Sequence, residues 1–261
     1  MNQIETKELS IAYDERVIVE DLNLSLPKGK ITSIIGPNGC GKSTILKTIG
    51  RIQKKKSGMV YLDGEDIFNL PTKTIARKMA ILPQTPTAPS GLTVKELVSY
   101  GRFPHQKGFG KLTTKDKEIV EWALKVTKLE EYAQREIDNL SGGQRQRVWI
   151  AMALAQQTEL ILLDEPTTYL DMAHQLEVLE LLEELNQKEG CTIVMVLHDL
   201  NLAARFSDFM VAVNQGKIKG TGTPEEVITK ECLRDVFQID ATIVNEPESQ
   251  RPVCLTYHLM K

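Results

Sequence analysis

The stretch from Ile31 to Thr44 constrains the fold of this chain more than any other. Its first five residues, Ile31–Ile35, form a short apolar run rich in β-branched side chains, which predicts a buried strand. A glycine-rich turn follows, and a helical pattern that includes Ile45, Leu46 and Ile49 begins directly after it. Strand, glycine-rich turn and helix are the context that the phosphate-binding pattern G-x-x-x-x-G-K-S requires.

The residue types at this joint explain how such a loop binds phosphate. Glycines let consecutive backbone N–H groups turn toward one anion, and the helix N-terminus adds about half a positive charge behind them. Lys42 is placed to reach the β- and γ-phosphates, and the Ser43 hydroxyl to bind Mg²⁺. We therefore expect a nucleotide site whose contacts come from Gly36, Asn38, Gly39, Cys40, Gly41, Lys42, Ser43 and Thr44.

Composition narrows the protein class. Lys and Arg number 32 against 35 Asp and Glu, a formal net charge of −3, which argues against a nucleic-acid binder that works through bulk positive charge. The four cysteines form no C-x-x-C pair, which argues against a disulfide framework or zinc site and suits a reducing cytosol. Because we find no signal segment and no apolar stretch long enough to cross a bilayer, we expect a soluble protein that reaches a membrane only through a partner.

The rest of the chain divides into β-rich and helical parts. Alternating Leu22, Leu24 and Leu26, with a further strand at residues 58–64, predict an antiparallel sheet beside the nucleotide site. After a proline-rich loop at 85–91, the pattern is helical from Leu92 to about residue 155, which indicates a mostly helical insert. Within it, residues 101–110 are expected to form an exposed loop carrying two phenylalanines, whereas the segment after Asp240 has a weak pattern.

Polar residues follow two further apolar strands. Residues 160–163 lead into Asp164 and Glu165, and residues 191–197 lead into His198. The carboxyl ends of parallel strands share one sheet edge, where ligands bind, so these side chains should gather near Gly36. Asp164 suits a Mg²⁺ ligand, and Glu165 is placed to orient or deprotonate an attacking water. His198 fits either a donor to the γ-phosphate or a structural histidine.

A second anion-type helix start lies at residues 140–144, where Ser141 is a good N-cap and two glycines follow it. Read alone, it is either a glycine-rich helix cap or part of a nucleotide pocket that is completed on another subunit. Tyr13, before the phosphate loop, likewise suits either stacking on an adenine ring or ordinary packing in the sheet. Arg145 and Arg147 are basic at the positive end of this helix, which suggests an electrostatic task near a bound anion.

Five elements now agree in order and spacing: residues 36–44, Gln84, residues 140–144, residues 160–165 and His198. Together they resemble the ATP-binding-cassette (ABC) ATPases over essentially the whole chain. The resemblance implies an α/β fold, with a P-loop ATPase core on a mostly parallel sheet, an N-terminal antiparallel β subdomain and an inserted helical subdomain. It implies one ABC domain at 1–241, with 1–85 and 156–241 as the core and 86–155 as the helical subdomain, and a C-terminal extension at 242–261.

The resemblance also implies residue roles. Two copies would form a sandwich dimer with two ATP molecules, each held between the phosphate loop of one copy and Ser141, Gly142, Gly143 and Gln144 of the other. Tyr13 would lie against the adenine and Asp171 would bridge the dimer. Glu165 would be the general base, His198 the γ-phosphate switch and Lys42 a stabiliser of the transferred phosphoryl group. Mg²⁺ would be held by Ser43, Gln84 and Asp164, and Gln84 would sense a membrane partner.

A narrower likeness covers residues 101–105, 166–171 and 236–241. These segments resemble the ATPases of bacterial ferric-siderophore, haem and cobalamin importers, most of all the ferric-hydroxamate type. This implies an ATP-driven motor on the cytoplasmic face of the membrane, bound to transmembrane permease subunits near Gln84 and residues 101–110. A substrate-binding lipoprotein would act indirectly, and no nucleic acid is expected. The alternative is a soluble ABC ATPase in iron–sulfur assembly; a DNA-repair type would need a long coiled coil, and no heptad run of that length is present.

Cys40 departs from this family pattern, which more often has alanine or serine there. A thiol at a helix N-terminus should be more acidic than usual. We therefore expect alkylation of Cys40 to inhibit the protein and bound ATP to protect it.

Overall fold

The computed structural model describes residues 2–106 and 111–260, which fall into two compact units. Unit 1 combines Met1–Leu70 with Asn186–Lys261, and unit 2 is Pro71–Leu185. Each unit therefore carries part of the residues expected at the nucleotide site. The subdomain boundaries expected near residues 86 and 155 stay a prediction.

Unit 1 contains the antiparallel sheet expected from the leucine alternation. Its strands β1 (Asn2–Tyr13), β2 (Arg16–Pro27), β4 (Ser57–Leu62) and β5 (Glu65–Asp66) lie in the order β2-β1-β4-β5, and neighbours are antiparallel. Leu22, Leu24 and Leu26 are buried on one face, while the residues between them are exposed. The period of two thus separates the core side of the sheet from the solvent side.

The parallel strands of unit 1 explain its apolar runs. Strand β3 (Ile31–Ile35) lies between β8 (Thr192–Val196) and β9 (Phe209–Asn214) and is parallel to both, whereas β10 (Lys217–Gly222) is antiparallel to β9. Every residue of β3 and β8 is buried, as expected for strands covered on both faces. The chain leaves β3 through the glycine-rich loop and enters α1 (Lys42–Ile49).

Unit 1 ends in a structure that the sequence did not predict. After α7 (Leu200–Phe206), α8 (Pro224–Val227) and α9 (Lys230–Phe237), the chain forms an antiparallel hairpin of β11 (Ile239–Asn245) and β12 (Pro252–Leu259). Asn201 of α7 anchors the hairpin, because its side chain accepts from the Cys254 N–H at 2.8 Å and donates to the Cys254 carbonyl at 3.3 Å. The C-terminal segment is thus an ordered part of the unit.

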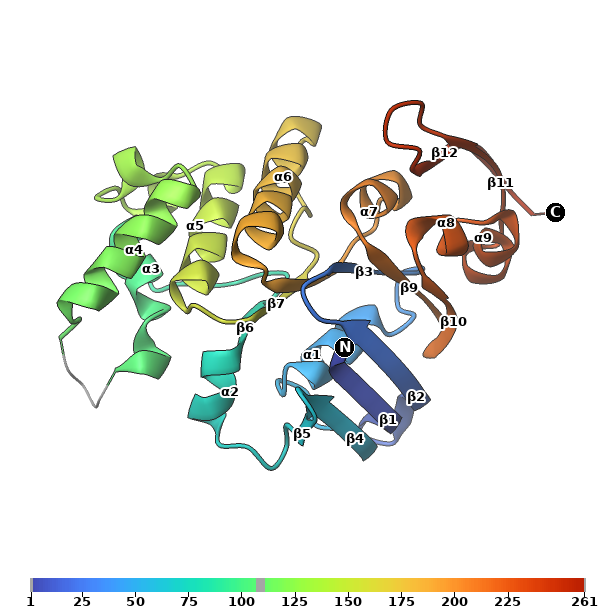
Figure 1. Cartoon of the computed structure of the whole chain (residues 1–261), viewed down its shortest axis with the longest axis horizontal. Coiled ribbons are helices and arrows are strands. Elements are labelled where there is room, and N and C mark those ends of the chain that lie inside the picture. The colour runs from blue at the N-terminus through green and yellow to red at the C-terminus, as the bar shows by residue number, and fades with distance from the viewer. Residues whose placement is uncertain (1, 107–110, 261) are drawn as a thin grey trace. The chain divides into compact units, whose positions relative to one another are not determined.

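Unit 2 holds the helical insert and a parallel strand pair. Strand β6 (Met79–Leu82) is parallel to β7 (Leu160–Asp164). Helices α3 (Val94–Tyr100), α4 (Thr114–Val126) and α5 (Gly142–Ala155) pack against one another, as the green and yellow-green ribbons of Figure 1 show. Helix α2 (Thr72–Lys78) precedes β6, and α6 (Met172–Glu189) leads out of the unit. Short 3-10 turns cover Phe103–His105, Glu130–Tyr132 and Ile137–Asn139. The expected mostly helical insert is confirmed.

The loop after α3 differs from its prediction. Arg102 was expected in an exposed loop, but it is only 4% exposed and lies inside unit 2. Phe103 does face solvent, at 56% exposed, and its ring stacks on that of Tyr100 with 4.8 Å between centroids. The second phenylalanine of this loop, Phe109, lies outside the described residues.

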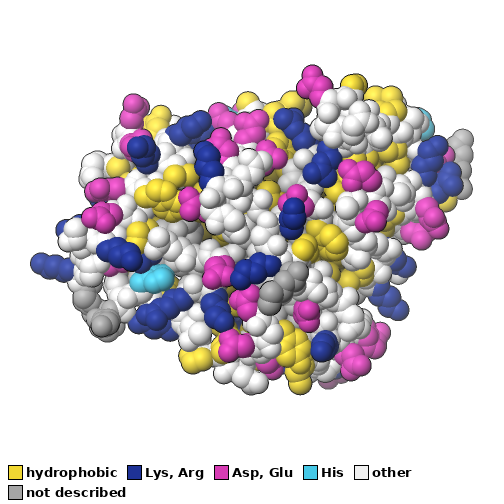
Figure 2. Space-filling view, in the orientation of Figure 1, with side chains coloured by type: hydrophobic (Ala, Val, Ile, Leu, Met, Phe, Trp, Pro, Cys, Tyr) yellow, Lys and Arg dark blue, Asp and Glu magenta, His cyan; other side chains and the backbone are white. Residues whose placement is uncertain are grey.

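The surface agrees with the nearly balanced charge. On the face shown in Figure 2, Lys and Arg side chains alternate with Asp and Glu over most of the area, so no large field of one sign is present on that face. Within residues 2–106 and 111–260, no helix has both the length and the apolar character needed to cross a membrane.

Candidate nucleotide site

The phosphate loop of unit 1 needs glycine for steric reasons. A Cβ built on Gly36 would lie 2.1 Å from the carbonyl oxygen of Val213 in β9, which leaves no room for a side chain. Gly39 and Gly41 have φ angles of 75° and 109°, a region that residues with side chains rarely adopt. Because the loop packs this closely on the neighbouring strand, its backbone is fixed where β3 ends.

Lys42 and the start of α1 supply the positive end of this loop. The Lys42 side chain is 4% exposed, and its Nζ donates to the carbonyls of Gly36 at 2.8 Å and Pro37 at 3.0 Å. Gly41 precedes the helix and offers no side-chain cap, and the first turn of α1 holds no acidic residue. An ammonium group and a helix N-terminus therefore meet at one place, as a bound polyphosphate requires.

The prediction of an unusually acidic thiol at Cys40 is wrong. Cys40 is only 5% exposed, and its Sγ would lie 2.8 Å from a Cβ on Gly36, so the side chain packs beneath the loop. Burial raises the pKa of the Cys40 thiol above its ordinary value, and the nearby charge of Lys42 offsets this only in part. The prediction considered only the helix N-terminus, which favours the thiolate. Burial of the thiol has the larger effect on its pKa.

In unit 2, Gln84 and Glu165 lie at the carboxyl ends of two neighbouring strands and are in contact. They follow β6 and β7, which are parallel neighbours, and Gln84 Nε2 donates to Glu165 Oε2 at 2.5 Å. The Thr168 hydroxyl donates to the same oxygen at 3.0 Å. Two donors thus hold the Glu165 carboxylate in one orientation, while its backbone takes a left-handed φ of 54°. Asp164, the last residue of β7, is 2% exposed.

His198 follows β8 in unit 1, at the edge where β3 ends. The Leu197 N–H donates to the Ile34 carbonyl at 3.3 Å, so the two strand ends lie side by side. His198 is exposed, and Asp199 caps α7 by accepting from the Leu202 N–H at 2.8 Å. The structure therefore brings His198 to the edge at which the phosphate loop begins.

The helix start at residues 140–144 forms the expected cap in unit 2. Ser141 Oγ accepts from the Gln144 N–H at 3.2 Å, and the Gln144 side chain accepts from the Ser141 N–H at 3.0 Å. This capping box leaves Ser141 and Gly142 exposed at the start of α5. Asp171 is exposed at the start of α6 and accepts from the backbone N–H of His174 at 3.0 Å.

Tyr13 ends β1 and is 45% exposed, which fits stacking on a base as well as ordinary packing in the sheet. The expected residues therefore divide between the two units. Tyr13, the phosphate loop and His198 lie in unit 1, whereas Gln84, Asp164, Glu165, the 141–144 helix start and Asp171 lie in unit 2. Each role assigned to them stays a prediction.

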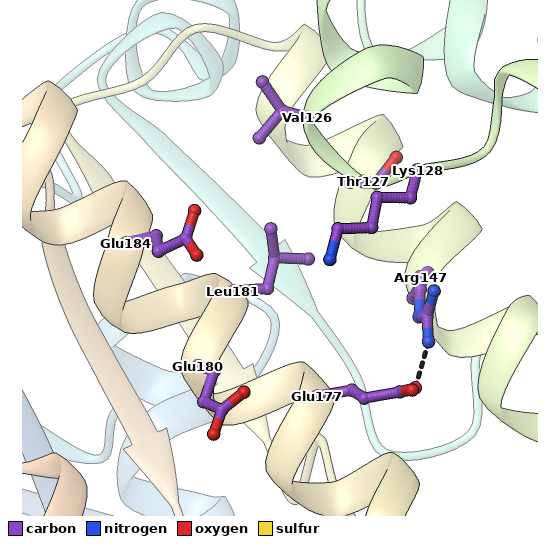
Figure 3. Close-up of a pocket in the computed structure, with 8 residues that line it drawn as sticks. All are labelled: Val126, Thr127, Lys128, Arg147, Glu177, Glu180, Leu181 and Glu184. Carbon is purple, nitrogen blue, oxygen red and sulfur yellow. Dashed lines mark hydrogen bonds and ion pairs between the residues drawn. The ribbon is translucent and has the colours of Figure 1, made fainter.

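A pocket of about 130 Å³ in unit 2 shows where Arg147 points (Figure 3). The guanidinium of Arg147 on α5 donates to the carboxylate of Glu177 on α6. Two more glutamates of α6, Glu180 and Glu184, line the same pocket. Lys128 lines this pocket too, and Arg147 also lines a second pocket with Ser141 and Gln144, so its expected role near an anion stays a prediction.

Sequence reasoning missed two residues of unit 2 that contact the two ends of α5. Arg102 was read only as part of a loop motif, yet its guanidinium donates to the Ala155 carbonyl, at the C-terminal end of α5, at 2.7 Å. His174 had no role, yet its ring donates to Asp171 and occupies the space beside Gly143. The spacing Asp171-x-x-His174 could have indicated a helix cap, but the contact with Gly143 has no local signal.

Known proteins resemble this chain along its whole length. A family model described as ABC transporter matches residues 19–168. The chain is 64% identical over 261 residues to the iron(3+)-hydroxamate import ATP-binding protein FhuC of Bacillus subtilis, covering 100% of this chain and 97% of that relative. It is 53% identical over 254 residues to the petrobactin import ATP-binding protein FpuD of Bacillus anthracis, covering 97% and 93%.

Solved structures agree with the sequence comparison. The dimeric structure of a bacterial ABC transporter cassette matches with a TM-score of 0.75 and 31% identity, covering 84% of this chain and 98% of that cassette. Along this chain, the phosphate loop is followed by the capped signature helix and then by the strand-end carboxylates. This chain belongs to the ABC transporter family, as one of its ATP-binding proteins.

Proposed function

We propose that this chain is the ATP-hydrolysing subunit of an importer for an iron chelate of the ferric-hydroxamate class. The high identity to FhuC over the full chain supports this substrate, and the lower identity to the petrobactin relative makes it the better candidate of the two. The protein would lie peripherally on the cytoplasmic face of the membrane, bound to separate permease subunits. A substrate-binding lipoprotein would act on the permease rather than on this chain.

The contact between Gln84 and Glu165 carries the proposal of ATP hydrolysis. A general base must be held within reach of the water whose proton it takes. Here the Glu165 carboxylate is oriented by donors from Gln84 and Thr168, directly after a strand that ends in Asp164. Glu165 would therefore position the attacking water and accept its proton, and Gln84 would link that carboxylate to the surface where the permease binds.

The side chains present fit a magnesium ion. Mg²⁺ prefers oxygen ligands, and the Ser43 hydroxyl, the Asp164 carboxylate and the Gln84 amide offer them. Because the Gln84 amide nitrogen donates to Glu165, its oxygen is the atom that remains for a metal. These three residues would hold Mg²⁺, which when bound neutralises charge on the β- and γ-phosphates.

The remaining groups would stabilise the transferred phosphoryl group. Lys42 would exchange its bonds to the Gly36 and Pro37 carbonyls for bonds to phosphate oxygens, a change that needs only rotation of its side chain. The N–H groups of the loop and the start of α1 would add fixed positive dipoles. His198 would contact the γ-phosphate from the end of β8, and Tyr13 would stack on the adenine.

Two copies would be needed for turnover. Each ATP would lie between the phosphate loop of one copy and the Ser141–Gln144 helix start of the other, with Asp171 bridging the copies. The match to a dimeric cassette and the exposure of Ser141 and Asp171 support this arrangement. Specific ATPase activity should therefore fall when the purified chain is diluted, and activity that is independent of concentration would argue against the paired site.

The test of the base is Glu165→Gln. This variant keeps the shape of the side chain but cannot accept the proton, so turnover should fall about 10²–10⁴-fold. ATP should still bind, and ATP-bound dimers should accumulate because hydrolysis no longer separates them. Size-exclusion chromatography with ATP and a phosphate-release assay measure both effects. Near-normal turnover of Glu165→Gln would remove Glu165 from this role.

The test of import is the identity of the partner. The chain should co-purify with a transmembrane permease, and a ferric hydroxamate should stimulate the ATPase of the reconstituted complex more than a ferric catecholate, haem or cobalamin does. Crosslinks from the exposed Tyr100–Phe103 pair should reach that permease, which is the contact expected beside Gln84. Co-purification with iron–sulfur scaffold proteins, without a permease, would favour the assembly-factor alternative.

A further inference from the structure

The segment before and at the start of α6 lies against the two glycines of the signature helix start. A Cβ built on Gly142 would be 3.9 Å from Leu170 Cδ2. A Cβ built on Gly143 would be 2.5 Å from His174 Cδ2 and 2.9 Å from its Cγ. Gly143 is buried, so the imidazole of His174 fills the space in which any side chain at position 143 would lie.

The other edge of the same ring is bonded to Asp171. His174 Nδ1 donates to Asp171 Oδ1 at 2.7 Å, and the His174 backbone N–H donates to that oxygen at 3.0 Å. These bonds, from the backbone first and then from the ring, hold the pKa of Asp171 below its ordinary value. The ring also lines a pocket of about 440 Å³ together with Ser141 and Gln144.

We infer that His174 is a positioning residue that fixes Asp171 relative to the Ser141–Gln144 helix start, so that both reach the nucleotide of the facing copy in register. The inference rests on the proposed function, because it assumes that these two segments act in trans on ATP. The juxtaposition that carries it is one imidazole, hydrogen-bonded to Asp171 and packed on Gly143.

A single side chain is suited to this task for a geometric reason. Asp171 and the signature helix start lie about thirty positions apart in the sequence, on segments that lead into different helices, α6 and α5. Arg147 and Glu177 pair further along these helices, and the ring of His174 contacts both Asp171 and Gly143 directly. Displacing a catalytic segment by about 1 Å can lower a rate by about 10²-fold, so a loosened contact should appear in turnover.

Three substitutions separate the two contacts of the ring. His174→Asn places an amide where Nδ1, Cγ and Cδ2 lie now, so it can still donate to Asp171 and still fill the space at Gly143. His174→Leu fills that space but has no donor, and His174→Ala loses both contacts. We expect kcat close to wild type for Asn, an intermediate value for Leu and a fall of about 10–100-fold for Ala. The affinity for nucleotide of the isolated copy should not change, because the phosphate loop lies in unit 1.

A cycle with Gly143→Ala supplies a readout that simple helix capping would not move. In the presence of His174, the added methyl group collides with the ring, and activity should be lost. Removing the ring should relieve that collision, so Gly143→Ala/His174→Ala should be at least about fivefold more active than Gly143→Ala alone, within the usual range for contacting residues. If the ring did not pack on Gly143, the second substitution would only add to the damage.

The assay is ATP turnover of the purified full chain at a concentration where wild type is active. His258→Ala, an exposed histidine on β12, is the matched control and should keep wild-type turnover. Equal activity of His174→Ala, Leu and Asn would overturn the inference, as would a double variant no more active than Gly143→Ala. Absence of ATPase activity in wild type would instead refute the proposed function, so the two failures are distinguishable.

Discussion

The buried pair of Arg102 and Asp116 allows a stability prediction that can be worked from the structure. The side chains are 4% and 9% exposed, and Arg102 Nε donates to Asp116 Oδ1 at 2.8 Å. The guanidinium also donates to the Ala155 carbonyl at 2.7 Å and to Gln157 Oε1 at 3.2 Å. Replacing Arg102 by methionine keeps an apolar stem of similar length but removes every one of these bonds.

The expected loss is large, because the substitution leaves a carboxylate buried without its cation. Breaking a buried ion pair from one side costs about 3–5 kcal/mol. With a urea slope of about 2 kcal/mol per M, the unfolding midpoint of Arg102→Met should fall by about 1.5–2.5 M. The double variant Arg102→Met/Asp116→Asn should be more stable than Arg102→Met alone, because the unpaired charge is then gone.

The assay can report unit 2 alone. The chain has 2 tryptophans, Trp122 on α4 and Trp149 on α5, and both lie in unit 2. Tryptophan fluorescence in urea therefore follows the unit that contains the ion pair. A midpoint shift below about 0.5 M for Arg102→Met, or a double variant less stable than it, would refute the reasoning.

The pair of Arg102 and Asp116 also predicts how the stability of the folded chain depends on pH. Burial pushes the pKa of Asp116 upward, but hydrogen bonds from the Thr113 hydroxyl and from Arg102 outweigh it and lower the pKa from 3.8 to about 2. Because the carboxylate is the form that folding stabilises, this contribution is present above about pH 4 and is lost as the pH falls toward about 2. Arg102→Met should lose less stability than wild type over this acidic range, since part of the lowering is absent.

Two further predictions concern the phosphate loop. Gly36→Ala should abolish ATP binding, because its methyl group would lie 2.1 Å from the Val213 carbonyl oxygen. The control Gly64→Ala has nothing within 4 Å of the new Cβ, so it should bind ATP and lose only about 1 kcal/mol of stability to its positive φ. Wild-type affinity of Gly36→Ala in a nucleotide-binding titration would contradict this. Iodoacetamide should alkylate Cys40 slowly both with and without ATP, because burial shields the thiol and raises its pKa. Mass spectrometry measures the alkylation rate, and a rate near that of the urea-unfolded chain would contradict this prediction.

The parts of the fold that the sequence predicted are those with local patterns. Leucines at every second position face the core of the N-terminal sheet, and the apolar run at Ile31–Ile35 is the buried strand β3. The strand-end rule also placed His198 at the edge where β3 ends, because β3 and β8 are parallel neighbours. In each case, a short segment contains enough information to decide which way its side chains point.

The hairpin β11–β12 shows why the C-terminal segment gave no pattern. Alternation arises when one face of a strand is buried, but in β12 only Pro252 and Cys254 are buried and the residues from Leu255 to Leu259 are exposed. The hairpin is instead held to α7 through the two hydrogen bonds between Asn201 and the backbone of Cys254. Contacts between residues so far apart in the sequence leave no periodic signal.

The prediction for Cys40 was wrong for a related reason. The helix N-terminus, which is visible in the sequence, favours the thiolate, but the position of the Sγ beneath Gly36 depends on how the loop packs on β9. Desolvation of the thiol opposes the effect of the helix and is the larger of the two influences on its pKa. A local electrostatic argument is therefore reliable only where the group stays in water.

Helix α5 connects the two surfaces of unit 2 that the proposed function requires. Its C-terminal carbonyls, of Ala155 and Gln156, accept hydrogen bonds from Arg102 and His105, in the loop that also carries the exposed Phe103. Its N-terminal end is the signature start, about 21 Å away along a helix of 14 residues. Because a helix transmits displacement along its axis with little compression, movement of a permease against this loop would shift the signature start and Asp171 together, provided that His174 joins them.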